Sequence, residues 1–182
     1  MEKAFNCKMC GQCCQGNGGI VATIEEQMAM ADFLNICLSE FQDQYIRKSK
    51  DKFFVQTSRQ GTCLFFIPDQ GCRVHPVKPR TCRAWPFFRG NLMDESSFDM
   101  AREYCSGINP DISFNEFVRQ GISYLEEHSL TSEMTNTPAN ALNISGVRGQ
   151  GAEGRRLKEE GRRLKAEGRR KKAEGRRKKA EG

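Results

Sequence analysis

Nine cysteines lie within the first 105 residues of this 182-residue chain, and none follows. Four of them form a dense run near the N-terminus, Cys7-x2-Cys10-x2-Cys13-Cys14. A turn between two cysteines spaced C-x2-C brings both sulfurs to one metal centre, and the third cysteine extends that set. The same triple spacing, with one remote cysteine, holds cubane iron–sulfur clusters. We therefore predict a metal centre whose remaining ligands come from far along the chain.

Four further cysteines stand alone in turn-rich segments and complete the candidate ligand set: Cys63, Cys72, Cys82 and Cys105. They could join the first four in one centre or build a second centre. The neighbours Cys13 and Cys14 are expected to point in different directions, which favours a multinuclear centre over a single structural zinc. The ninth cysteine, Cys37, lies between Ile36 and Leu38 and is expected to be a small buried hydrophobic residue.

A disulfide framework is the alternative for so many cysteines in a small protein. The number of cysteines is odd, and the first residues, MEKAFNC, contain no apolar stretch of signal-peptide length. We therefore expect a cytoplasmic, reducing compartment in which thiols stay free. The sequence contains no run of about 18 apolar residues, so no membrane span is expected.

The hydrophobic pattern predicts a mainly helical fold with a short β-hairpin. Three capping boxes mark expected helix starts: Thr23 with Glu26, Ser39 with Gln42, and Ser113 with Glu116. The first helix would turn positions 24, 28, 31 and 34 inward, and the second would bury Phe41 and Tyr45. Another short helix is expected over residues 97–105, and the last would run to His128.

Strands are expected at residues 53–55 and 62–67, with a turn at 68–71 that leads into residues 72–74. Three prolines between residues 75 and 86 permit only turns or a short helix there. The hydrophobic core would be small. We therefore predict a small cysteine-rich domain that is organised by its metal.

Composition divides the chain into a cysteine-bearing domain (1–130), a linker rich in Thr, Asn, Ser and Gly (131–151), and a basic heptad-repeat tail (152–182). Residues 1–130 carry 14 Lys or Arg and 16 Asp or Glu, a net charge of −2, whereas residues 131–182 carry +8. A glycine in every heptad costs about 1 kcal/mol of helix stability. We expect a tail that is disordered or a fraying helix, and nucleic acid as a partner only through that tail.

Cationic and aromatic residues surround the isolated cysteines. Lys78, Arg80 and Arg83 flank Cys82, where they would either offset the charge of a thiolate-rich centre or form a solvated basic turn. His75 is expected to lie beside the centre or at the surface rather than to bind metal. Five aromatic residues would exclude solvent from the centre or fill the core: Phe65, Phe66, Trp85, Phe87 and Phe88.

The run CKMCGQCC at residues 7–14 resembles the signature of the YkgJ-like cysteine-cluster family, the CxxCxxCC zinc- or iron-chelating domain. Residues 72–87, CRVHPVKPRTCRAWPF, are similar to its second block, C-x-I-Y-x-x-R-P-x-x-C-R-x-F-P-F. Residues 102–107, REYCSG, resemble the segment around its closing cysteine, and the similarity extends over about residues 5–128. His75 and Lys78 depart from the pattern, which has Tyr and Arg there.

The resemblance implies a domain that binds an iron–sulfur cluster, of the 4Fe–4S kind, or zinc or iron ions. The implied ligands are Cys7, Cys10, Cys13, Cys14, Cys63, Cys72, Cys82 and Cys105. We expect electron transfer, redox or metal handling with a protein or redox partner. A zinc-stapled interaction module stays open as an alternative, as does part of an iron–sulfur oxidoreductase or a protein-methylating system. The sequence leaves enzymatic activity undecided, because it contains no G-x-G-x-x-G, P-loop or Cys-x3-Cys-x2-Cys motif.

Overall fold

The structure is a computed structural model that describes residues 2–16, 19–131, 140–144 and 147. The chain divides into two units, Met1–Ile144 and Ser145–Gly182, and every element named below lies in the first. In chain order these are η1 (Gln12–Cys14), α1 (Ile24–Leu34), α2 (Leu38–Tyr45), β1 (Ile46–Ser49), β2 (Lys52–Val55), β3 (Phe66–Ile67), β4 (Gly71–Cys72), η2 (His75–Val77), α3 (Arg80–Ala84), α4 (Arg89–Met93), α5 (Glu95–Tyr104), α6 (Phe114–Glu127) and η3 (Asn140–Leu142). The predicted mainly helical fold with a short hairpin is confirmed.

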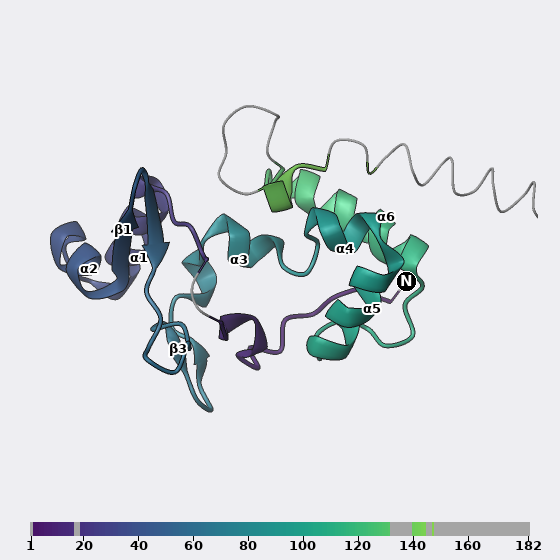
Figure 1. Cartoon of the computed structure of the whole chain (residues 1–182), viewed down its shortest axis with the longest axis horizontal. Helices are drawn as coiled ribbons and strands as arrows, with labels where there is room; N and C mark the ends of the chain where they lie inside the picture. The colour runs from purple at the N-terminus through teal and green to yellow at the C-terminus, as the bar shows by residue number, and fades with distance from the viewer. Residues whose placement is uncertain (1, 17–18, 132–139, 145–146, 148–182) are drawn as a thin grey trace, which may run out of the picture. The chain divides into compact units, whose positions relative to one another are not determined.

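Two groups of elements form the first unit, and Figure 1 shows them at its two ends with α3 between them. One group holds α1, α2 and the antiparallel hairpin β1–β2, in which Ile46 lies opposite Val55. The other holds α4, α5 and α6. A second hairpin pairs Phe66 of β3 with Cys72 of β4, and it is shorter than the predicted strand over 62–67. The structure thus adds the strand β1 and the helix α4, which the sequence pattern did not predict.

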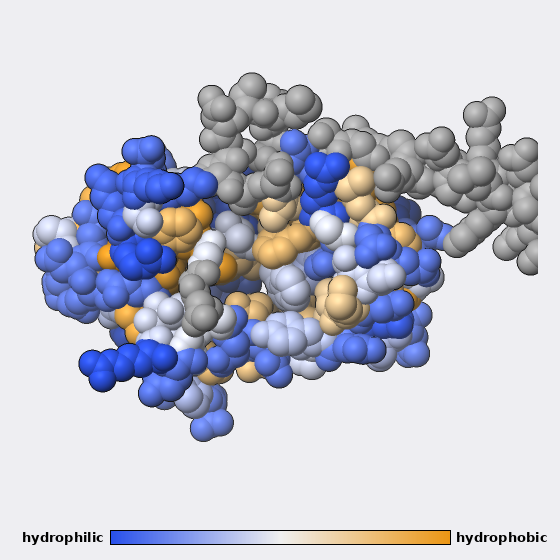
Figure 2. All heavy atoms as spheres, in the orientation of Figure 1, coloured by the Kyte–Doolittle hydropathy of each residue, from blue (hydrophilic) through white to orange (hydrophobic). Residues whose placement is uncertain are grey.

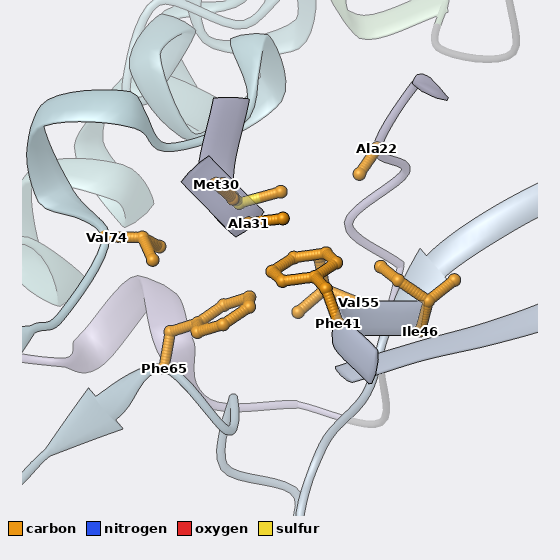
Figure 3. Packing of buried hydrophobic residues seen from close by; sticks show 8 residues of the cluster. All are labelled: Ala22, Met30, Ala31, Phe41, Ile46, Val55, Phe65 and Val74. Atoms are coloured by element: carbon orange, nitrogen blue, oxygen red, sulfur yellow. The ribbon is translucent and has the colours of Figure 1, made fainter. Parts of the chain in front are cut away.

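The group around α1 and α2 packs on a hydrophobic cluster that we call the amino-terminal core (Figure 3): Ala22, Met30, Ala31, Phe41, Ile46, Val55, Phe65 and Val74. Phe41 and Phe65 stack in this core with ring centroids 5.8 Å apart. Full burial of one such side chain contributes about 1.5–3 kcal/mol. Phe41 is buried as predicted, whereas Tyr45 is half-buried and stacks on Phe65.

The other group packs on three phenylalanine rings. The ring of Phe117 in α6 lies 5.0 Å from that of Phe87 and 4.6 Å from that of Phe98, measured between centroids. Gly121 lets α6 pack closely against Phe87 and Leu92, because a Cβ at this position would lie 2.6 Å from Phe87 and 2.8 Å from Leu92. The two ends of the unit therefore have separate aromatic cores. In Figure 2, hydrophilic residues cover much of both ends, and more hydrophobic residues gather between them.

Helix starts follow the predicted caps in two of three cases. Thr23 and Glu26 form the complete capping box of α1, and the Ser113 hydroxyl accepts from the backbone of α6. The predicted box at Ser39 is wrong. The helix α2 begins earlier, with Cys37 as its N-cap and without a side-chain cap bond. Ser39 therefore lies inside the first turn, where its hydroxyl meets the Cys37 sulfur at 3.1 Å.

The inward face of α1 agrees with the prediction at Ala31 and Leu34 but not at positions 24 and 28. Ile24 and Met28 are 37% and 49% exposed, whereas Gln27 is fully buried beside Met30 and Ala31. The Gln27 amide donates to the carbonyl oxygen of Ala22 at 2.9 Å and accepts from Gln42 at 2.8 Å. A polar side chain can be buried at low cost when its hydrogen bonds are satisfied. These hydrogen bonds orient α1 so that Gln27 faces the core, while the apolar residues Ile24 and Met28 face solvent.

The structure bears on the predicted absence of a membrane span, and the predicted basic tail lies outside the residues it describes. None of the helices in the described ranges combines the length and hydrophobicity that a membrane span requires. The predicted linker is described only in part, and its η3 segment contacts α4 within the first unit.

Candidate metal centre

All eight cysteines predicted as ligands line one cavity of about 210 Å³: Cys7, Cys10, Cys13, Cys14, Cys63, Cys72, Cys82 and Cys105. They come from the N-terminal segment, the β3–β4 region, α3 and the end of α5. No Asp or Glu occurs among the described residues that line it, and Phe66 and Trp85 add apolar wall. A single buried water fills about 10–15 Å³ of such space, so the cavity is much larger than one ion requires.

Cys37 lies away from this cavity, and its predicted burial is wrong. Its side chain is exposed. Cys37 is the N-cap of α2 and has an extended backbone, whereas its neighbour Ile36 packs against the amino-terminal core.

The segment that carries the first four cysteines, residues 7–16, is called the cysteine loop below. At its C-terminal end it pairs with the β3 region: the Cys63 N–H donates to the Cys14 carbonyl oxygen at 2.8 Å. The Gly16 N–H donates to the Gly61 carbonyl oxygen, also at 2.8 Å. These bonds hold Cys14 and Cys63, which are far apart in the sequence, side by side in the cavity wall.

The N-terminal end of the cysteine loop is fixed by the segment around Cys105. The Asn6 N–H donates to the Gly107 carbonyl oxygen at 2.8 Å, and the Tyr104 hydroxyl donates to the Gln12 carbonyl oxygen. Sequence reasoning assigned no role in the site to Tyr104 or Gly107, although both lie in the REYCSG segment that resembles the family's closing motif. Their contacts bring the end of α5 to the same cavity as the loop.

Gly11 lets the cysteine loop lie directly on β3. Its φ is +81°, in the left-handed region, and a Cβ there would lie 2.2 Å from the ring of Phe66. Only glycine meets both requirements without strain. The contact sets the height of the loop over the hairpin and therefore the positions of Cys10 and Cys13.

Exposure differs among the eight cysteines. Cys10 and Cys13 are exposed, and Cys105 is buried. The other five are half-buried: Cys7, Cys14, Cys63, Cys72 and Cys82. The buried Cys105 sulfur accepts a hydrogen bond from the Trp85 indole N–H at 3.4 Å. Solvent therefore reaches Cys10 and Cys13 more readily than Cys105.

Cys13 and Cys14 line the same cavity, although the sequence predicts that they point in different directions. The Cys14 side chain and the Lys78 charge lower the pKa of Cys13 to about 6. The Cys13 side chain and burial raise the pKa of Cys14. The tight 3₁₀ turn of η1 carries both residues, so adjacent sulfurs reach one side of the cavity.

Burial raises the pKa of Cys63, Cys72 and Cys82, and the nearby thiols of the set add repulsion between thiolates. These thiols are therefore protonated when no cation replaces the proton. A metal binds the thiolate, so that metal uptake must release protons from these side chains.

His75 and Lys78 both line the cavity and contact each other. The distance from Lys78 Nζ to His75 Nε2 is 3.3 Å. Burial and the Lys78 charge lower the pKa of His75, so the imidazole is neutral at pH 7 and its Nε2 accepts the bond. These are the two positions that depart from the family pattern described above. His75 therefore lies in the wall of the cavity, and its predicted place beside the centre or at the surface, rather than as a ligand, stays a prediction.

Of the three cationic residues predicted to flank Cys82, Lys78 lines the cavity, and Arg80 and Arg83 are not among its described lining residues. The Arg80 guanidinium donates to the carbonyl oxygens of Ser129 and Thr131, at 2.7 and 3.3 Å. Arg83 is absent from the residues described around the cavity, and its carbonyl oxygen accepts from the Tyr124 hydroxyl. Arg80 is thus used to attach the end of α6 rather than to face the thiols.

The donor chemistry of the cavity fits zinc and iron, since thiolate sulfur binds both zinc and iron–sulfur clusters. In the part of the chain that the structure describes, no three Cys, His, Asp or Glu side chains are grouped so that they could hold a metal ion. The eight thiols instead are spread over the wall of the cavity.

Comparison with known proteins agrees with this donor set. The family model CxxCxxCC, described as a putative zinc- or iron-chelating domain, matches residues 6–106, more than half of the chain. No solved structure matches the chain. The matched range contains all eight cysteines of the cavity. The chain therefore belongs to the CxxCxxCC family of zinc- or iron-chelating domains.

Proposed function

We propose that the chain holds an iron–sulfur cluster through its cavity cysteines and serves in electron transfer, redox sensing or metal handling. The observation that carries the proposal is the convergence of eight cysteines on one cavity without a carboxylate among the described lining residues. Such a donor set suits thiophilic metals, because Mg²⁺ and Ca²⁺ require oxygen ligands.

The number of thiols and the size of the cavity favour a cluster over one zinc ion. A structural zinc site takes four ligands in a compact tetrahedron, and the cavity offers eight cysteines around about 210 Å³. Iron–sulfur clusters are larger and are held by cysteine thiolates in apolar surroundings.

We assign roles to the residues of the site from their hydrogen bonds and their exposure. The cavity cysteines would supply the ligands, and the Trp85 N–H donates to the sulfur of Cys105. Hydrogen bonds to ligand sulfur are one of the factors that set a cluster's reduction potential. Bound there, a cluster would supply one-electron chemistry. The exposed side at Cys10 and Cys13 would admit an electron partner.

Anaerobic purification tests the proposal. The full chain should be brown, with iron and acid-labile sulfide in similar amounts. Cys63→Ser should lose most of both, and Cys37→Ser, whose side chain lies outside the cavity, should keep them. Colourless protein with stoichiometric zinc would contradict the iron–sulfur proposal and leave zinc chelation.

A second candidate is a zinc-stapled interaction module, in which metal serves only the fold. It is favoured by the position of the cavity, whose lining combines Phe65 of the amino-terminal core with Trp85 and Cys105 from the other end of the unit. A metal there would join two ends that have separate aromatic cores. Under this alternative Cys82→Ser should unfold the protein as well as release metal. A folded, metal-free variant would contradict it.

A further inference from the structure

Lys78 carries a positive charge into the wall of the cysteine cavity. Its side chain is half-buried and lines the cavity. The same wall carries Cys13, Cys72 and Cys82, which come from three different segments of the chain. The ammonium group is therefore placed among the cysteine set rather than beside one neighbour in the chain.

Within the described part of the chain, no carboxylate forms an ion pair with this charge. The ion pairs found in the described residues are Arg102–Asp99 and Arg119–Glu116, and no Asp or Glu is among the described residues of the lining. A charge that is partly withdrawn from water is costly unless an opposite charge lies nearby. The thiolates are the negative groups that the cavity can offer to Lys78.

His75 holds Lys78 in this position. Its Nε2 accepts from the ammonium at 3.3 Å, and both side chains are half-buried in the same wall. A neutral acceptor fixes the direction of a flexible lysine without cancelling its charge. Lys8, a second lysine of the lining, is exposed, so that solvent and salt screen its charge more strongly.

We propose that Lys78 is the fixed countercharge of the metal centre and that His75 is the residue that positions it. The inference rests on the proposed metal binding. A centre ligated by four thiolates has a net negative charge, which increases by one when a cluster accepts an electron from a reductant such as dithionite. A fixed cation stabilises the more negative state. Lys78 therefore raises the reduction potential and strengthens metal binding against competition from protons.

The experiment compares five full-length proteins purified without oxygen: wild type, Lys78→Met, Lys78→Arg, His75→Phe and Lys52→Met. Lys52 is an exposed residue of β2 outside the cavity lining and serves as the matched control. The reduction potential is measured by spectroelectrochemical titration. Affinity for Co²⁺, used as a spectroscopic probe in place of zinc, is measured on the metal-free proteins at pH 7.

Lys78→Met should lower the reduction potential and weaken Co²⁺ binding by about 10- to 100-fold. Lys78→Arg should stay close to wild type because it keeps the charge, and Lys52→Met should not change either value. His75→Phe should shift both values in the direction of Lys78→Met but less far. If Lys78→Met does not fold, Lys78→Gln replaces it. Lys78→Gln also removes the charge, and an unchanged reduction potential and Co²⁺ affinity in this variant would refute the proposal.

The outcomes separate this inference from the proposed function. A wild-type chain that takes up neither iron with sulfide nor Co²⁺ would refute the metal centre itself. A wild-type chain that binds metal, together with a Lys78→Met variant of unchanged potential and affinity, would refute the countercharge alone. Equal effects of Lys78→Met and Lys52→Met would also refute it, since they would show a general charge effect.

Discussion

Replacing Gly11 by alanine should weaken metal binding without unfolding the protein. The residue has a φ of +81°, and its new Cβ would lie 2.2, 2.5 and 2.7 Å from three atoms of the Phe66 ring. The cysteine loop would have to lift from β3 or displace that ring. Either movement changes the positions of Cys10, Cys13 and Cys14, which flank Gly11 in the sequence.

Two costs add in this variant. A non-glycine residue in the left-handed region costs about 1–2 kcal/mol. Displacing the outer edge of a half-buried ring lies near the lower end of the usual overpacking cost, about 1 kcal/mol. The sum of about 2–3 kcal/mol destabilises the conformation of the cysteine loop that binds metal. Since 1.4 kcal/mol is a factor of ten, affinity should fall by about 30- to 150-fold.

An anaerobic Co²⁺ titration, followed through the thiolate-to-metal charge-transfer absorption, measures this change. Gly16→Ala is the matched control, because its φ is +130° and nothing lies within 4 Å of its Cβ. It should show a backbone cost without a clash. The double variant Gly11→Ala, Phe66→Ala should recover the part of the loss that the ring causes, roughly fivefold. Wild-type affinity in Gly11→Ala, or no recovery in the double variant, would refute the reasoning.

Three further results are expected. Phe117→Ala, at a side chain with 0% exposure between two other rings, should lower the free energy of unfolding by about 3–5 kcal/mol in a urea titration. Gly90→Ala, in α4 with nothing within 4 Å of its Cβ, should instead stabilise by about 0.5–1 kcal/mol; any loss would contradict the open space seen there. Hydrogen bonds from Arg119 and Gln120 lower the pKa of Glu116 from 4.5 to about 2, so its stabilising effect is complete above pH 4.5 and lost as the pH falls to 2. The urea midpoint of the wild type should therefore fall more steeply over this range than that of Glu116→Gln.

The candidate site could be predicted from the sequence because its signal is local. The C-x2-C spacings and the isolated cysteines identified the eight residues that the structure brings to one cavity. The caps at Thr23 and Ser113 were predictable for the same reason, since an N-cap bond joins residues three apart.

Two of the errors have a different cause, which is a partner far away in the sequence. Gln27 is buried through its bond with Gln42, and Arg80 is turned from the cavity by the carbonyl oxygens of Ser129 and Thr131. The Ser39 cap fails because α2 begins before it. No hydrophobic period or cap pattern contains such contacts, so helix faces and side-chain directions required the structure.

The hydrogen bond between Trp85 and Cys105 gives the protein an internal optical reporter. Trp85 is the single tryptophan of the chain, and its indole N–H contacts a candidate ligand sulfur. Its ring also packs edge-on against Phe88, with centroids 5.4 Å apart, which restricts its rotation. All indole emission therefore originates beside the cavity. Uptake or loss of metal should change its intensity and can be followed in real time without a label.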